Sequence, residues 1–287
     1  MSLEADHLVA AVALKSAAAG ALALALGGAP LGVLLIARRM SLMGDGLSHG
    51  LLPGVAIAYL VAGPDPVALT IGALVAAVLV AGAASLFARM RSLPEDASFA
   101  VFYLSALAAG VLILGGAHDA EAVHHLLLGE AGAFDAPGLI LAASAATATL
   151  ICLALFLRGF LAEGADPTFM RSVGAPGWLL HLLLTMLVAV NLVAGYRAFG
   201  ALMTIGLMMI PAAAARFWAR GYVGQAAVAV LISAVASGAG LVMAQGLGLE
   251  PGPIMVLAAA TLFAASWIFG THNGLIQNLP GRAHLEG

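Results

Sequence analysis

Long apolar stretches follow one another along this chain, and only short polar segments separate them. We find nine such stretches, at about 12–37, 46–62, 67–88, 98–115, 137–157, 177–195, 199–219, 223–247 and 253–270. A helix needs about 20 apolar residues to cross the hydrocarbon core of a bilayer. The residue alternation that a membrane β-barrel requires is missing. The pattern therefore predicts an all-α fold, a polytopic transmembrane helix bundle of about eight or nine spans.

Composition supports a membrane protein and excludes a soluble one. Hydrophobic residues make up 63% of the 287 positions and charged residues only 9%, which leaves too little polar surface to coat a globule in water. The first stretch contains the run Gly27-Gly28-Ala29-Pro30, where we expect a kink or a split. No linker or internal repeat divides the sequence, so residues 1–287 are expected to form a single transmembrane domain.

The basic residues predict the orientation, because Lys and Arg are retained on the cytoplasmic side of short loops. With nine spans and the N-terminus outside, nine of the 11 basic residues face the cytoplasm: Arg38, Arg39, Arg89, Arg91, Arg158, Arg171, Arg216, Arg220 and Arg282. The outer loops are then acidic and contain histidines. This count favours an odd number of crossings.

The segment 38–54 brings an acid and an imidazole into the second span. On a helix, Asp45 and His49 are one turn apart and share a face. Carboxylate oxygen and imidazole nitrogen both suit zinc and manganese. Two ligands hold an ion weakly, which suits a station on a transport path. The alternative is that Asp45 pairs with Arg38 or Arg39 while His49 is a packing residue.

The same span carries a proline and a glycine repeat. Pro53 has no N–H, so we expect it to free the carbonyl of His49 from the helix ladder. Gly46, Gly50 and Gly54 recur every four residues, which lets a second helix approach closely. The span is therefore expected to be buried in the bundle.

A second candidate site is the long cytoplasmic segment at about 159–175. Asp166 as N-cap, Pro167 at the first helical position and Gly174 just past the end predict a short capped helix. The helix would expose an apolar set that has no need to face lipid: Phe169, Met170 and Val173. Such a patch favours docking to a partner protein. The alternative is a helix that lies among the lipid headgroups.

Histidines also gather in one outer loop. His118, His124 and His125 lie close to acidic residues and suit brief binding of zinc, although an ordinary solvated loop is the alternative. Four other residues with metal-binding side chains are interpreted as packing residues of the spans: His181, Met203, Met208 and Met209.

The sequence lacks the motifs of an enzyme that hydrolyses ATP. A Walker A loop needs a lysine after its glycines, and Lys15, the one lysine, lies within the first apolar stretch. We therefore expect no enzymatic activity from this chain, no tightly bound cofactor and no nucleic-acid partner. ATP hydrolysis would have to come from another subunit.

Three blocks together resemble the membrane permeases of bacterial zinc, manganese and iron uptake ABC transporters. These are RRMSLMGDGLSHGLLPG at 38–54, DPTFMRSVG at 166–174 and FGALMTIGLMMIPAAAAR at 199–216. The resemblance implies a homodimeric permease in the bacterial plasma membrane, with two ATP-binding subunits inside and a metal-binding protein outside.

The resemblance also implies roles for individual residues. Asp45 and His49 would be ligands on the metal path. The segment that would press into the ATP-binding subunit includes Asp166, Pro167, Phe169, Met170, Arg171 and Gly174. The outer histidines favour zinc as the transported ion over manganese or iron. A rival hypothesis is an ion-coupled secondary carrier, which should have more protonatable residues within its spans.

Overall fold

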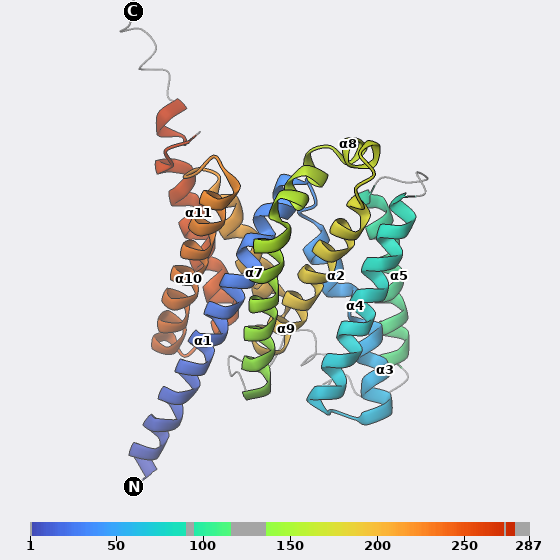
Figure 1. The fold of residues 1–287 in the computed structure, drawn as a ribbon. Helices are drawn as coiled ribbons and strands as arrows, with labels where there is room; N and C mark the ends of the chain where they lie inside the picture. Colours follow the sequence, from blue (N-terminus) through green and yellow to red (C-terminus); the bar gives the residue numbers. More distant parts are fainter. Residues whose placement is uncertain (1, 90–94, 116–135, 273, 279–287) are drawn as a thin grey trace, which may run out of the picture.

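The structure is a computed structural model that describes residues 2–89, 95–115, 136–272 and 274–278. These residues form a helix bundle without strands (Figure 1). The helices are α1 (Ser2–Ala37), α2 (Met43–Gly50), α3 (Leu52–Ala62), α4 (Pro66–Arg89), α5 (Glu95–Gly115), α7 (Ala136–Ala165), α8 (Pro167–Ser172), α9 (Gly177–Ala215), α10 (Tyr222–Leu247) and α11 (Pro251–Phe269), before a 3-10 turn at Ile276–Asn278. In this described part, eight segments are long and apolar enough to span a membrane, which confirms the predicted fold class.

The chain reverses within α9, at Gly200. This residue has φ 78° and ψ 172°, so the two halves of α9 are separate helices across a sharp bend. A Cβ atom on Gly195 would lie 2.4 Å from the side chain of Thr204, because the second half folds back beside the first. The stretch predicted at 199–219 is therefore a shorter apolar helix, Met203–Ala215, which accounts for eight long spans where nine stretches were expected.

Replacing Gly200 with alanine is expected to lower the melting temperature of the detergent-solubilised protein. The backbone conformation at this residue is essentially restricted to glycine and costs other residues roughly 1–3 kcal/mol. Gly238 is the matched control, because it is exposed within α10 and a Cβ added there meets nothing within 4 Å. Equal melting temperatures for Gly200→Ala and Gly238→Ala would contradict the assigned bend.

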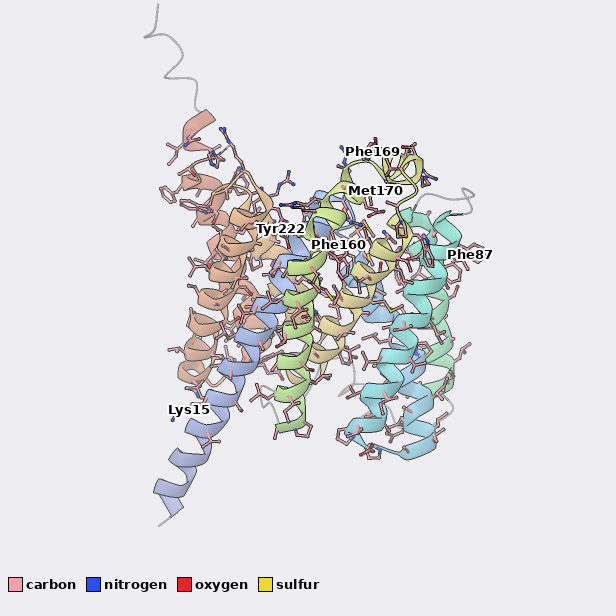
Figure 2. The ribbon with its side chains drawn as sticks, viewed as in Figure 1. Lys15, Phe87, Phe160, Phe169, Met170 and Tyr222 are labelled. Atoms are coloured by element: carbon pink, nitrogen blue, oxygen red, sulfur yellow. The ribbon has the colours of Figure 1, made fainter. Side chains whose placement is uncertain are left out.

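The two ends of the bundle differ in charge. The start of α1 lies at one end, and α8 and the end of α11 lie at the other (Figure 1). Arginines of the helix ends and connections gather at the α8 end: Arg38, Arg39, Arg158, Arg171, Arg216 and Arg220. Lys15 points out near the opposite end (Figure 2), where Asp65 and Glu250 occupy the connections α3–α4 and α10–α11. The positive-inside rule assigns the α8 end to the cytoplasm.

Helix α1 runs through the bundle without the expected split. Pro30 lies inside the continuous helix Ser2–Ala37. The neighbouring glycines serve close packing, since a Cβ on Gly32 would lie within 2.1 Å of the carbonyl oxygen of Met208 in the second half of α9. A Cβ on Gly27 would likewise collide with the Asn191 side chain in the first half. Both halves of α9 are thus held against α1.

Candidate functional site

The turn between α1 and α2 places the acid–imidazole pair. The N–H of Met40 donates to the carbonyl of Leu35 and that of Arg39 to Ile36, at 2.9 and 3.2 Å. Arg39 has φ 62°, the left-handed conformation that commonly ends a helix. The chain then enters α2 within three residues, and Asp45 lies in the first turn of that helix.

Helix α2 buries one face and leaves the pair on the other. Met43 and Leu47 are almost fully buried, whereas the side chains of Asp45 and His49 are 58% and 41% exposed. His49 Nε2 lies 3.7 Å from Asp45 Oδ1, so the two side chains share a face as predicted. Two ligands about 2.1 Å from a tetrahedral zinc ion are themselves roughly 3.4 Å apart. A small adjustment of either side chain would let both groups bind one ion.

The glycine face of this span packs as the sequence predicts. A Cβ on Gly46 would lie 2.7 Å from the ring of Tyr103 in α5, and a Cβ on Gly54 would lie within 2.0 Å of the Gly72 carbonyl in α4. The expectation that the span is buried is therefore correct for this face. It is wrong for the face that carries Asp45 and His49, which the single chain leaves accessible.

The expectation that Pro53 leaves the carbonyl of His49 without a hydrogen bond is wrong. Helix α2 ends at Gly50 and α3 begins at Leu52, with Pro53 in its first turn. The N–H of Leu51 donates to the carbonyl of His49. That carbonyl is therefore satisfied by the turn between the two helices and is not left free beside the pair.

Arg38 forms an ion pair with Glu163, which argues against the alternative that Arg38 pairs with Asp45. Its Nη1 lies 2.5 Å from Glu163 Oε2, and its Nη2 donates to the carbonyl of Phe160 at 2.7 Å. The side chains of Arg38 and Glu163 are only 6% and 12% exposed. Among the described residues, no ion pair is recorded between Asp45 and Arg39 either. The ionisable group next to the Asp45 carboxylate is thus the imidazole of His49.

The short helix α8 forms as the capping residues predict. Asp166 Oδ1 accepts the N–H groups of Thr168 and Phe169, each at 2.9 Å. Pro167 is the first helical residue, and Gly174 follows the helix with φ 70°. The sequence therefore specifies both ends of α8.

The exposed surface of α8 is smaller than expected. Phe169 lies at the cytoplasmic end of the bundle (Figure 2) and is 55% exposed. Val173 is 57% exposed, and Arg171 is exposed as well. Met170 is only 8% exposed, so the expectation that it joins the exposed set is wrong. It faces inward because it fills the space between α8 and the start of α9, near Gly177.

The other metal-binding candidates have different outcomes. His118, His124 and His125 lie outside the described residues, so their prediction stays open. Within the described ranges, no three His, Cys, Asp or Glu side chains gather into a metal site. Met203 and Met208 are 1% and 2% exposed, which confirms them as core residues.

Together these features define a polytopic α-helical membrane protein with an acid–imidazole pair in one span and an exposed apolar helix at its arginine-rich end. Residues 11–270 match the model of the ABC 3 transport family, and the chain belongs to this family. It is a multi-pass permease of the bacterial plasma membrane, as the three sequence blocks indicated.

Known proteins of this family align along most of the chain. The manganese transport system membrane protein MntC of Halalkalibacterium halodurans is 27% identical over 86% of this chain and 83% of its own length. The zinc transport system membrane protein TroC of Treponema pallidum is 26% identical over 95% and 94%. The solved structure of PsaBC from Streptococcus pneumoniae in complex with Fab has a TM-score of 0.78 at 25% identity, with 92% of this chain and 94% of that chain covered.

Proposed function

We propose that this chain is the permease subunit of an ATP-driven importer of divalent transition metal ions. The observation that carries the proposal is the pair Asp45 and His49, whose ligand atoms lie 3.7 Å apart on the accessible face of α2. Ionisable side chains are costly to place within a membrane span, so a pair of them at this position is a candidate for a functional site. Its carboxylate and imidazole suit a first-row divalent ion.

A second copy of the chain would complete this path. One chain supplies two ligands, while a closed zinc site has four. A twofold axis facing the accessible side of α2 would bring a second Asp45 and His49 to the same place. This arrangement supports a homodimer, with the pair lining the passage between the two copies.

The substrate is proposed to be zinc, with manganese as the second candidate. The choice of zinc is based on the histidines of the predicted outer loop, His118, His124 and His125, and on the imidazole of His49. Manganese is favoured by the relative MntC, which is named for manganese transport, whereas TroC is named for zinc transport. One carboxylate and one imidazole accept either ion, so competition between the two ions decides the substrate.

The energy is proposed to come from an ATP-binding subunit docked on α8, and the ion from a metal-binding protein on the outer face. Reconstitution with both partners in proteoliposomes tests this proposal. We expect zinc uptake that requires ATP and that manganese inhibits only in excess. Manganese uptake that zinc does not inhibit would reverse the substrate assignment. Uptake that ignores ATP and follows an imposed proton gradient would instead establish a secondary carrier.

Replacing Phe169 with glutamate is expected to uncouple transport from ATP hydrolysis. The ring is 55% exposed on α8, and loss of an aromatic anchor from an interface weakens binding by about 2 kcal/mol, or roughly thirtyfold. The measurement is co-purification of the ATP-binding subunit together with ATP-dependent uptake. Phe169→Leu is the matched control, because it keeps an apolar contact and should keep most activity. Full uptake by Phe169→Glu would refute docking through this face.

A further inference from the structure

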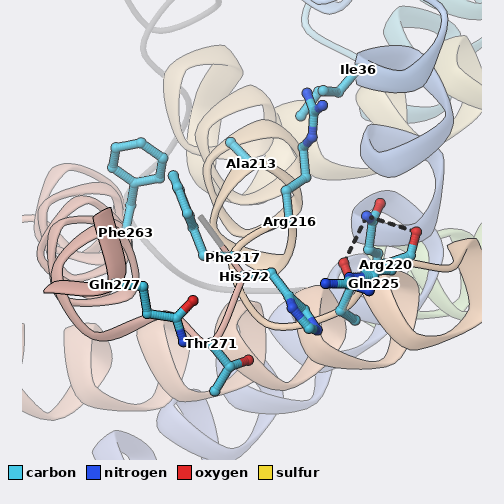
Figure 3. A pocket seen from close by; sticks show the side chains of 11 residues that line it. Ile36, Ala213, Arg216, Phe217, Arg220, Gln225, Phe263, Thr271, His272 and Gln277 are labelled. Carbon is cyan, nitrogen blue, oxygen red and sulfur yellow. Dashed lines mark hydrogen bonds between the residues drawn. The ribbon is translucent and has the colours of Figure 1, made fainter. Parts of the chain in front are cut away.

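A cavity of about 630 Å³, whose lining side chains are drawn in Figure 3, lies at the cytoplasmic end of the bundle. Ile36 at the end of α1, Ala213 in α9, Gln225 in α10 and Phe263 in α11 contribute to its wall. Cavities of this size are typical of sites for small molecules or for parts of larger ligands. Neither the metal pair nor α8 contributes to it, so the cavity is available for a separate role.

The ionisable side chains among the described residues that line this cavity are all basic. Arg216 and Arg220 come from the connection between α9 and α10, and His272 follows α11. None of the described lining residues is acidic, and neither arginine has a recorded ion pair within the described chain. Two guanidinium groups with no neutralising carboxylate attract an anion, and their planar forks match phosphate oxygens.

Short contacts hold the walls in place. The rings of Phe217 and Phe263 pack edge to face with centroids 5.9 Å apart. The N–H of His272 donates to the carbonyl of Phe217 at 2.8 Å, and Gln225 Nε2 donates to the carbonyl of Ala219 at 2.9 Å. Gly270 leaves no room for a side chain against Phe217. The cavity is therefore preformed, and a ligand would not have to order it.

The surroundings favour an amphipathic anion over a soluble one. Trp218 and Trp267, close to the cavity in sequence, are 39% and 47% exposed, and such tryptophans mark the interface between membrane and water. The rings of Phe217 and Phe263 give the cavity an apolar part of its wall. Phe269, 64% exposed at the end of α11, adds apolar surface nearby. The site thus combines a headgroup region with apolar surface for an acyl chain.

We propose that this cavity binds the phosphate headgroup of an anionic phospholipid from the cytoplasmic leaflet. Arg216 and Arg220 hold the phosphate, and His272 and Gln277 provide further polar contacts around it. The lipid would tether the end of the second half of α9, because Arg216 directly follows that helix. The site does not depend on metal transport or on ATP.

Native mass spectrometry of the delipidated full-length protein tests the site, with phosphatidylglycerol, phosphatidylcholine and free glycerol phosphate as the three probes. We expect phosphatidylglycerol to bind best and free glycerol phosphate to bind at least tenfold more weakly. Each basic residue beside an anionic lipid contributes about a fivefold change in affinity, so Arg216→Gln and Arg220→Gln should each weaken phosphatidylglycerol binding by that factor. The double variant Arg216→Gln with Arg220→Gln should bind phosphatidylglycerol roughly twenty-five-fold more weakly than the unaltered protein.

Arg158→Gln is the matched control, because Arg158 is exposed near the same end of the bundle but does not line the cavity. It should bind phosphatidylglycerol like the unaltered protein. If Arg158→Gln and Arg216→Gln weakened phosphatidylglycerol binding equally, the proposal would be overturned, because the lipid would then be attracted by the basic surface in general. Equal binding of glycerol phosphate and phosphatidylglycerol would also overturn it and would make the cavity a site for soluble phosphates. Arg216→Lys keeps the charge but loses the planar fork, so it should bind phosphatidylglycerol better than Arg216→Gln and less well than the unaltered protein, and this intermediate binding would show that the loss in Arg216→Gln is not a folding defect.

Discussion

Metal uptake is expected to be lost when Asp45 is replaced by asparagine, while the protein remains folded. The amide keeps the shape of the carboxylate but removes the negative charge that attracts a divalent ion. Because the side chain of Asp45 is 58% exposed and its ionisable neighbour is the His49 imidazole, the substitution should change the free energy of unfolding by less than about 0.5 kcal/mol. The measurement is ATP-dependent uptake in proteoliposomes, together with the melting temperature and the basal ATPase rate of the complex.

Asp65→Asn is the matched control for this experiment. Asp65 Oδ2 accepts the N–H of Ala68 at the start of α4, and asparagine caps a helix about as well as aspartate. Uptake should therefore survive Asp65→Asn and disappear in Asp45→Asn, and His49→Ala should behave like Asp45→Asn. If Asp45→Asn fails to assemble, the pair has a packing role. If it transports normally, α2 does not line the metal path.

The sequence predicts the spans well because each must satisfy its own backbone in lipid. Helix α8 is equally well specified, since Asp166, Pro167 and Gly174 determine its ends locally. The spacing of Asp45 and His49 predicts their shared face for the same reason. These features depend on residues within one or two turns of one another.

Features that depend on contacts between distant parts of the chain could not be predicted from the sequence pattern. The second half of α9 is apolar like a full span, and its shortness follows only from the reversal at Gly200. Met170 has the pattern of an exposed residue, yet the start of α9 covers it. The ion pair joins Arg38, in the turn after α1, to Glu163, near the end of α7. The sequence shows two adjacent arginines, Arg38 and Arg39, after the first predicted span and two acids, Glu163 and Asp166, after the fifth, and it does not say which of them pair.

Loss of this buried ion pair is expected to be the most destabilising single change of charge in the bundle. Glu163→Gln leaves the guanidinium of Arg38, whose side chain is 6% exposed, without its carboxylate, and breaking a buried pair typically costs roughly 3–5 kcal/mol. Replacing both partners by apolar residues of similar size avoids this penalty. Arg38→Met with Glu163→Leu should therefore melt well above Glu163→Gln alone. Glu250→Gln, at an exposed acid of the opposite end, should leave the melting temperature unchanged.

The ion pair between Arg38 and Glu163 lies between the two candidate functional segments of the chain. Arg38 directly follows α1 and precedes α2, while Glu163 lies three residues before the N-cap of α8. The ion pair thus connects the segment that carries the metal pair with the segment proposed to dock on the ATP-binding subunit. The apolar double variant should regain stability yet transport less metal for each ATP hydrolysed, because packing alone is less directional than a charge-assisted contact. A double variant with normal coupling would limit Arg38 and Glu163 to a structural role.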